Sequence, residues 1–174
     1  MLTRTVFVNI TTMAIASFSA HPDQTPFGGV TGNNTAADMS GVKILIIDDS
    51  KTIRHTAEAL LKKYGCKIIT ATDGFEALAK IVDHHPDIIF VDIMMPRLDG
   101  YQTCALIKQN RNYRNIPVVL LSSKDGLFDR ARGRIVGSDR YLSKPFTREE
   151  LLNAIKELIL VEKNKLPGRA SPEG

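Results

Sequence analysis

Three aspartates stand directly behind apolar runs of strand length in this chain. Asp48 and Asp49 follow residues 43–47, and Asp92 follows residues 87–91. Acids at the carboxyl ends of parallel strands meet at one edge of a sheet, where their like charges repel unless a cation or a proton relieves them. The pattern therefore predicts a site for a divalent metal ion.

The same residues predict phosphoryl chemistry. Hard oxygen ligands at a solvent-accessible edge favour Mg²⁺, which often shares its site with a phosphoryl group. Asp92 is the candidate nucleophile, because a carboxylate can attack a phosphoryl group to give an acyl phosphate. Lys144 would neutralise charge on the phosphoryl oxygens, and Ser122 would offer its hydroxyl to one of them. Backbone N–H groups after Asp92 would complete the cradle.

A parallel sheet must position these side chains, and the hydrophobic pattern predicts one. Segments of strand and helix periodicity alternate five times. We expect strands at 43–47, 67–71, 87–91, 116–121 and 140–143, and helices at 51–64, 74–84, 99–109, 125–136 and 147–160. Strands that are apolar throughout are typical of sheets covered on both faces. The prediction is a doubly wound (βα)₅ α/β fold, a flavodoxin-like three-layer sandwich with a parallel five-stranded sheet in the order 2-1-3-4-5.

The loop after the first strand argues against nucleotide and flavin binding. It reads Asp48-Asp49-Ser50-Lys51 and contains neither a glycine-rich phosphate cradle nor a Walker lysine. The acids therefore lie at the predicted switch point between strands 1 and 3 without a nucleotide motif beside them.

The chain divides into a domain and two tails. Residues 1–41 are rich in Thr, Asn, Ser, Gly and Pro and carry few charges, so we expect a disordered N-terminal extension. Residues 42–160 are the expected domain, and residues 161–174 resemble a solvated, disordered tail. The beginning of the chain weakly imitates a secretory signal, but Asn9 interrupts its apolar stretch. Met39 is an alternative start of translation.

Composition sets the remaining bounds. The chain has 174 residues, 43% of them apolar, and a formal net charge of +4. This length fits one domain of about 100–150 residues with tails. The charges are interspersed and do not indicate nucleic-acid binding, and no stretch approaches the roughly 20 apolar residues of a membrane span. Cys66 and Cys104 match no metal or redox spacing, which predicts reduced thiols in a cytoplasmic protein.

Together, the motifs resemble the signature set of response-regulator receiver domains. The resemblance covers about residues 42–160 and keeps every motif in order. The matching residues are Asp48-Asp49, Asp92 within Val91-Asp92-Ile93-Met94-Met95-Pro96-Arg97-Leu98-Asp99-Gly100, Leu121-Ser122-Ser123, and Lys144-Pro145-Phe146.

This resemblance implies a role for each site residue. Asp92 would accept phosphate from a histidine kinase, and Asp49 would bind Mg²⁺ directly. Asp48 would assist through water, and the Met94 backbone carbonyl would be a further ligand. In the family, the peptide bond between the site lysine and the following proline, here Lys144–Pro145, is cis.

The resemblance also implies a switch. Ser122 and Tyr141 match the family's switch pair. On phosphorylation the hydroxyl is drawn toward the phosphoryl group and the aromatic ring turns inward. The face formed by the fourth helix, the fifth strand and the fifth helix then changes its affinity for a partner.

Within the family, two segments resemble stand-alone receivers that regulate twitching motility and type IV pili. They are residues 95–101 (MPRLDGY) and 121–129 (LSSKDGLFD). This narrower resemblance implies a histidine kinase of a chemosensory type, a downstream target such as the pilus machinery, and a switch rather than an enzyme. We expect a cytoplasmic monomer that binds no nucleic acid and does not insert into a membrane.

Two variable positions of the family flank the path of the water that would remove the phosphoryl group. Here they are Met94 and Lys124, and neither side chain can orient water as a general base would. We therefore expect slow self-dephosphorylation. Near the expected output face lies a group of arginines that either favours an acidic partner or forms a solvated helix face: Arg130, Arg132, Arg134, Arg140 and Arg148.

Three alternatives belong to other classes. A phosphatase of the haloacid dehalogenase type also uses a nucleophilic aspartate with Mg²⁺, but it needs a second aspartate where this chain has Met94. A transcription factor needs a DNA-binding module, and only about 14 residues follow the last predicted helix. A scaffold that has lost phosphorylation would be expected to have a broken acidic pocket, and here the pocket is complete. A receiver that acts on a different signalling target also remains open.

Overall fold

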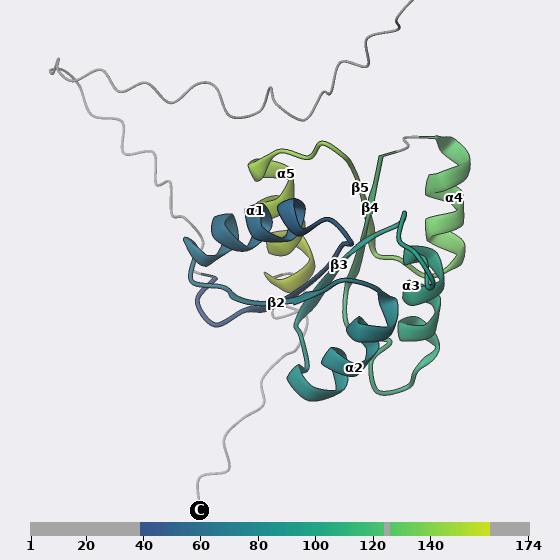
Figure 1. Cartoon of the computed structure of the whole chain (residues 1–174), viewed down its shortest axis with the longest axis horizontal. Coiled ribbons are helices and arrows are strands. Elements are labelled where there is room, and N and C mark those ends of the chain that lie inside the picture. The colour runs from purple at the N-terminus through teal and green to yellow at the C-terminus, as the bar shows by residue number, and fades with distance from the viewer. Residues whose placement is uncertain (1–38, 124–125, 161–174) are drawn as a thin grey trace, which may run out of the picture. The chain divides into compact units, whose positions relative to one another are not determined.

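The computed structural model describes residues 39–123 and 126–160, and strands alternate with helices there as predicted (Figure 1). The strands are β1 (Lys43–Ile47), β2 (Lys67–Ala71), β3 (Ile88–Asp92), β4 (Val118–Ser122) and β5 (Arg140–Ser143). The helices are α1 (Lys51–Lys62), α2 (Gly74–His84), α3 (Gly100–Gln109), α4 (Leu127–Ile135) and α5 (Arg148–Ile155), which continues as the π-helical segment Lys156–Leu160.

The strands form a parallel sheet in the order β2-β1-β3-β4-β5, which confirms the predicted topology. Helices α1 and α5 cover one face of the sheet, and α2, α3 and α4 cover the other (Figure 1). This is the predicted doubly wound three-layer sandwich. Because the strand order reverses between β1 and β3, the carboxyl ends of these two strands form the switch point where ligands bind in such sheets.

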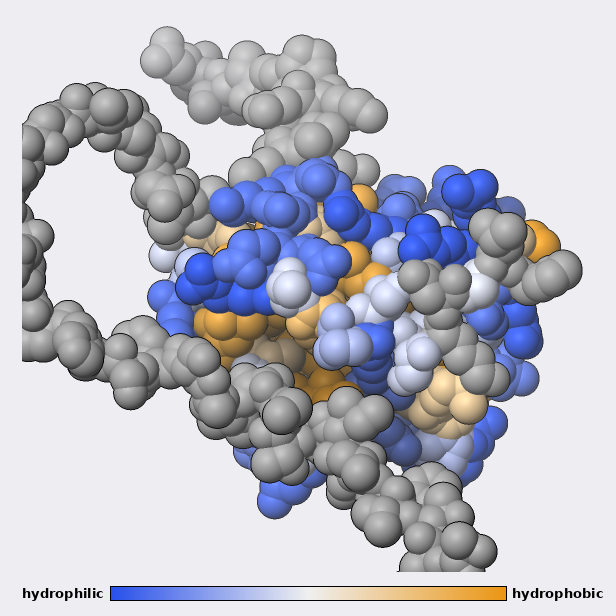
Figure 2. Space-filling view, turned by 90° about the horizontal axis from the view of Figure 1, so that it is seen from above, coloured by the Kyte–Doolittle hydropathy of each residue, from blue (hydrophilic) through white to orange (hydrophobic). Residues whose placement is uncertain are grey.

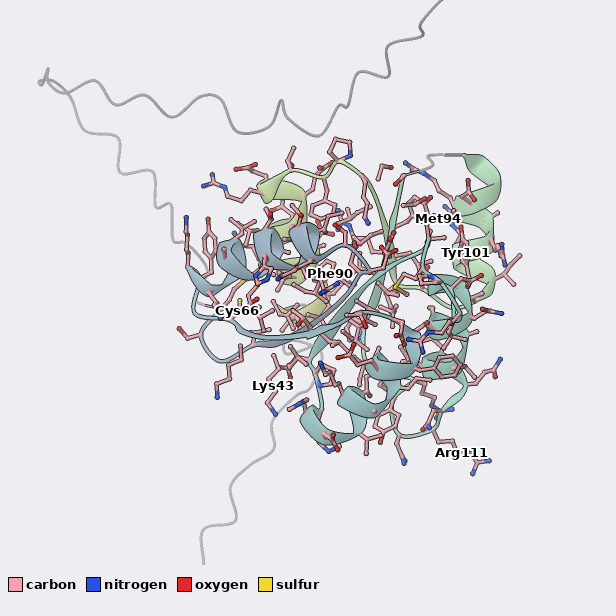
Figure 3. The ribbon with its side chains drawn as sticks, viewed as in Figure 1. Lys43, Cys66, Phe90, Met94, Tyr101 and Arg111 are labelled. Carbon is pink, nitrogen blue, oxygen red and sulfur yellow. The ribbon has the colours of Figure 1, made fainter. Side chains whose placement is uncertain are left out.

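Side chains of the central strands alternate between two hydrophobic cores, one on each face of the sheet. In β1, Ile44 and Ile46 belong to the core under α1 and α5, whereas Leu45 and Ile47 belong to the core under α2 and α3. Phe90 of β3 is almost fully buried in the core under α1 and α5, in the interior of the domain (Figure 3). The two cores hold β1 and β3 side by side, and this fixes the positions of the acids at their ends.

Strands β3 and β4 end later than the sequence pattern predicts. Asp92 and Ser122 are the last residues of these strands rather than the first residues of the loops. The ladder extends this far because the N–H of Ile93 donates to the Leu121 carbonyl at 2.9 Å. Strand β4 also begins later than predicted, at Val118, because Pro117 has no N–H to donate to the sheet. Two site residues are therefore held by the sheet itself.

Polar side chains define the starts of the helices next to the site. Ser50 caps α1 by accepting a hydrogen bond from the N–H of Ile53. Thr147 and Glu150 form a capping box at the start of α5, and Asp99 forms another with Gln102 at the start of α3. These caps satisfy N–H groups that the first turn of a helix leaves unpaired. Each loop at the carboxyl edge of β1 and β3 therefore leads into a well-defined helix.

The folded part begins before residue 42, the predicted domain boundary. Met39 is only 4% exposed and belongs to the core under α1 and α5. Its carbonyl accepts from the N–H of Val42, and the N–H of Gly41 donates to the Gly65 carbonyl. The predicted N-terminal extension therefore contributes at least one core residue, whereas residues 1–38 and the predicted tail 161–174 lie outside the described residues.

The surface carries both hydrophilic and apolar side chains. In the view from above, hydrophilic residues dominate and apolar patches lie between them (Figure 2). Within the described ranges, no helix combines the length and apolar character needed to span a bilayer. Large apolar residues with exposed side chains are Phe75, Val82, Met94, Leu106 and Ile135.

Candidate functional site

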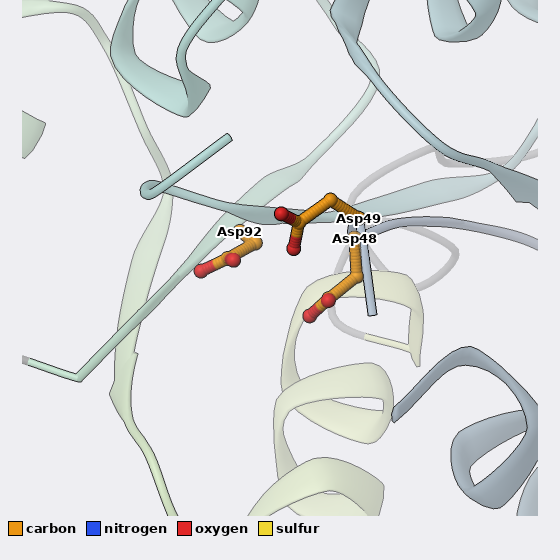
Figure 4. Close-up of side chains that lie close together, drawn as sticks. All are labelled: Asp48, Asp49 and Asp92. Atoms are coloured by element: carbon orange, nitrogen blue, oxygen red, sulfur yellow. The ribbon is translucent and has the colours of Figure 1, made fainter. Parts of the chain in front are cut away.

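The three predicted aspartates meet at the carboxyl edge of the sheet (Figure 4). Asp48 and Asp49 directly follow β1, and Asp92 ends the neighbouring strand β3. One carboxylate oxygen from each residue lies within 4.8 Å of the other two. The fold thus brings together the acids that the sequence places at the switch point.

Lys144 places its ammonium group between two of these acids. Its Nζ lies 2.7 Å from Asp48 Oδ2 and 3.0 Å from Asp92 Oδ1. Lys144 directly follows β5, and its backbone N–H donates to the Ser122 carbonyl at 2.6 Å. The Lys144–Pro145 peptide bond is cis, as the resemblance implies. The lysine therefore reaches the acids from a backbone that is anchored to the end of β4.

Negative charge exceeds positive charge in this pocket. When all three carboxylates are ionised, the Lys144 ammonium balances the charge of one of them. Asp48 and Asp92 are 0% and 5% exposed, so water screens their repulsion poorly. A divalent cation would offset the remaining excess of negative charge.

The three acids differ in the oxygens that they can offer. Both oxygens of Asp48 already accept hydrogen bonds, Oδ1 from the N–H of Ser50 at 2.8 Å and Oδ2 from Lys144. Asp49 is exposed, and its carboxylate accepts no hydrogen bond from the described residues. Asp92 Oδ1 is buried, and it forms an ion pair with Lys144 but accepts no hydrogen bond from the described residues. Free oxygens on Asp49 and Asp92 fit a hard cation such as Mg²⁺.

The pocket disfavours the ionised form of Asp92. Burial is the largest cause, and it raises the pKa of this carboxyl group above its ordinary value of 3.8. The charge of Asp48 also raises this pKa, whereas the ammonium of Lys144 and the N–H of Met94 lower it. Because burial outweighs the lysine, the carboxylate would gain stability from any further positive charge.

The two residues of the predicted switch pair lie on neighbouring strands. Ser122 ends β4 and is 2% exposed, and Tyr141 lies in β5 opposite Leu120. The Tyr141 ring is half-buried against the core under α2 and α3, and the guanidinium carbon of Arg130 lies 5.7 Å from its centroid. The ring thus contacts α4 through Arg130, so a movement of Tyr141 would change the packing of that helix.

The loop from β3 to α3 runs close to the backbone of Asp92. A Cβ atom at Gly100 would lie 2.3 Å from the Asp92 carbonyl oxygen, so no other residue fits there without moving the backbone of Asp92. Met94 projects from this loop with 58% of its surface exposed, at the opposite end of the sheet from Lys43 (Figure 3). Lys124, the other predicted flanking residue, lies outside the described residues.

An ion pair fastens the same loop to α2. Arg97 adopts a left-handed backbone conformation with φ of 69°, which is unusual for a residue with a side chain. Its guanidinium pairs with the carboxylate of Asp73, the N-cap of α2, and lies 5.9 Å from the centroid of the Phe75 ring. This contact was not predicted, because Arg97 and Asp73 lie far apart in the sequence.

Arg54 contacts the backbone of the acid cluster and was not predicted as a site residue. The residue lies in α1, and its side chain donates to backbone carbonyls of Asp48 and Asp49. A basic residue in an amphipathic helix usually faces solvent, so its type alone gave no signal. The available clue was its position in the first turn of the helix that follows the acids.

A comparison with protein families agrees with this geometry. Residues 44–156 match the model of the response regulator receiver domain. The chain belongs to the response regulator receiver family. Protein PilG of Pseudomonas aeruginosa is 74% identical over 116 residues, which cover 67% of this chain and 86% of PilG. The probable transcriptional regulator ycf27 of Cyanophora paradoxa is 36% identical over 137 residues, which cover 79% of this chain and 56% of that protein.

Solved receiver structures share the fold. Chemotaxis protein CheY4 of Vibrio cholerae has a TM-score of 0.65 and 31% identity, and the match covers 68% of this chain and 99% of CheY4. The receiver domain of the sensor histidine kinase PA1611 of Pseudomonas aeruginosa has a TM-score of 0.64 and 30% identity over 69% of this chain and 98% of that domain. That domain holds a magnesium ion in its active-site cleft.

Replacing the charge of Asp92 is expected to stabilise the metal-free receiver. A carboxyl group whose folded pKa is raised begins to cost stability as the pH rises through its unfolded pKa, and the cost is complete above the folded pKa. Asp92→Asn should therefore raise the free energy of unfolding by about 1 kcal/mol at pH 7. The difference from wild type should shrink as the pH falls through the folded pKa, and it should be smallest well below the unfolded pKa of about 3.9, where the carboxyl group is protonated in both states.

Urea unfolding in the presence of a chelator measures this effect. The exposed carboxylate of Asp83, near the end of α2, offers a matched control, and Asp83→Asn should leave the free energy of unfolding at pH 7 close to that of wild type. A variant Asp92→Asn that is less stable than wild type at pH 7 would contradict the charge argument.

Proposed function

We propose that this receiver is a stand-alone phosphoacceptor, in which Asp92 takes a phosphoryl group from a histidine kinase of a chemosensory type when Mg²⁺ is bound. The observation that carries this proposal is the environment of Asp92 Oδ1. It is buried, faces the ammonium of Lys144 and accepts no hydrogen bond from the described residues. A buried charged oxygen without a hydrogen bond is costly, and a bound cation removes this cost.

The roles of the surrounding residues follow from their positions. Asp49 and Asp92 would hold Mg²⁺ with the Met94 carbonyl, and Asp48 would assist through water because both of its oxygens are already hydrogen-bonded. When bound, the metal would draw charge from the phosphoryl oxygens. Lys144 would neutralise a second phosphoryl oxygen, and the hydroxyl of Ser122 would donate to a third.

The transfer forms one bond and breaks one. A carboxylate oxygen of Asp92 bonds to phosphorus while the bond from phosphorus to the kinase histidine breaks. The departing imidazole keeps the electron pair and takes up a proton. The product is an acyl phosphate on Asp92, and the protein acts as a switch that is reset when water removes the phosphoryl group.

We infer that the signal leaves through the face formed by α4, β5 and α5. Ser122 would move toward the phosphoryl group, and the Tyr141 ring would follow it inward. Arg130 on α4 lies against that ring, so the movement of the ring would shift α4. A change in the affinity of this face for a downstream protein is the expected output.

The specific role that we propose is the control of type IV pilus twitching motility. The protein would act in the cytoplasm. The proposed role is supported by the resemblance of residues 95–101 and 121–129 to pilus regulators and by the 74% identity with PilG. A different signalling target is the alternative within the family. The protein would act as a monomer on a protein partner, without binding nucleic acid.

A phosphatase of the haloacid dehalogenase type is the alternative from another class. It needs an acid–base group two residues after the nucleophile, and the thioether of Met94 cannot transfer protons. Methionine at this position therefore favours a phosphorylation switch over a phosphatase.

Incubation with Mg²⁺ and acetyl phosphate tests the phosphoacceptor. Wild type should gain the mass of one phosphoryl group, because the site supplies the nucleophile and neutralises the transferred charge. Hydroxylamine, which attacks acyl phosphates, should remove this mass. Asp92→Asn is the matched control and should gain none. The proposal is wrong if wild type shows no adduct, or if the variant carries the same adduct.

The exposed Met94 predicts a long-lived phosphoryl group. Met94→Asn places an amide that can orient water beside the acyl phosphate, and it should speed the loss of phosphate by about tenfold. Ile135→Asn makes the same kind of change at an exposed position on α4 and should have no effect. Intact mass followed over time measures both rates. A wild-type lifetime of only a few seconds would count against slow release.

A further inference from the structure

The side chain of Arg54 reaches back from α1 to the end of β1. Its Nη1 donates to the Asp48 carbonyl at 2.5 Å and to the Asp49 carbonyl at 3.0 Å. Arg54 is half-buried, and its own backbone N–H donates to the Ser50 carbonyl. One guanidinium group therefore satisfies two carbonyls that lie beyond the last residue of the strand.

These two hydrogen bonds fix the backbone on both sides of Asp49. Each carbonyl lies in a planar peptide group, so the bond to Asp48 holds the plane before Asp49 and the bond to Asp49 holds the plane after it. The second plane is also held at its other end, because the N–H of Ser50 donates to Asp48 Oδ1. With both planes fixed, the direction in which the Asp49 side chain leaves the backbone is set.

Asp49 depends on this backbone more than its neighbours do. The Asp48 carboxylate is held by Ser50 and Lys144, and Asp92 is part of β3. The Asp49 side chain is exposed and accepts no hydrogen bond from the described residues, yet it contributes an oxygen to the acid cluster. Only the backbone keeps this carboxylate close to Asp92.

We propose that Arg54 is a positioning residue for the metal site, which holds the Asp49 carboxylate within reach of the ion that Asp92 also binds. This inference rests on the proposed function, since it assumes that Mg²⁺ binds there. Two effects of Arg54 on the ion have opposite signs. Its positive charge repels Mg²⁺, whereas its hydrogen bonds place a ligand for it. Outer-shell contacts of this kind commonly change metal affinity by about tenfold or more, so positioning prevails.

Titration of the full-length protein with Mg²⁺ in a calorimeter separates the two effects. Arg54→Met should bind Mg²⁺ about tenfold more weakly than wild type, although it removes a repelling charge. Lys51→Met is the matched control, since it removes an exposed positive charge of the same helix, and it should bind Mg²⁺ as tightly as wild type or more tightly. Arg54→Lys keeps the charge on a shorter side chain and should lie between wild type and Arg54→Met.

A second measurement distinguishes positioning from a general loss of structure. In the reaction with acetyl phosphate, Arg54→Met should need about tenfold more Mg²⁺ for half of its maximal rate, while the rate at saturating Mg²⁺ stays close to wild type. Urea unfolding confirms that each variant is folded. If Arg54→Met does not fold, Arg54→Lys decides the question, because any weaker binding in that variant comes from position and not from charge.

The outcomes separate this inference from the proposed function. If wild type binds Mg²⁺ and both Arg54 variants bind it as tightly or more tightly, Arg54 has no positioning role while the phosphoacceptor stands. If wild type shows no Mg²⁺ binding at millimolar concentrations, both are wrong.

Discussion

Repulsion among Asp48, Asp49 and Asp92 is the constraint on which the rest of the site depends. The acids cannot relieve it by moving apart, because β1 and β3 are paired residue by residue up to Ile47 and Val91. Lys144 relieves part of it and leaves an excess of negative charge. Such a pocket favours a divalent cation, because the charge of the cation offsets the negative charge that the fold has concentrated there. The proposed phosphoryl group is itself negative, so it would need that cation and Lys144 beside it.

The same connections that hold the charges lead to the expected output face. Lys144 is tied through its backbone to Ser122, and β5 carries Tyr141. Tyr101 of α3 contacts helix α4 in two ways: its hydroxyl donates to the Asp129 carbonyl at 3.2 Å, and the guanidinium of Arg132 lies 4.3 Å from its ring centroid. The position of α4 therefore depends on α3 as well as on β5.

Much of this architecture was predictable from the sequence because it follows from local patterns. Alternating apolar runs and helical stripes predicted the sheet, and acids at strand ends predicted the cluster around Asp92. The contacts of Arg54, the close approach at Gly100 and the burial of Met39 were missed. Each depends on the path that the backbone takes between the contacting residues, and a single residue type carries no record of that path.

The clearest measurement of the central claim is the free energy of unfolding of wild type as a function of Mg²⁺ concentration, at pH 7 and constant ionic strength. If the ion fills the charge deficit of the pocket, stability should rise by about 1.4 kcal/mol for each tenfold increase in Mg²⁺ above the dissociation constant. Holding the ionic strength with a monovalent salt removes general screening from the comparison. A free energy of unfolding that does not change with Mg²⁺ would contradict the account.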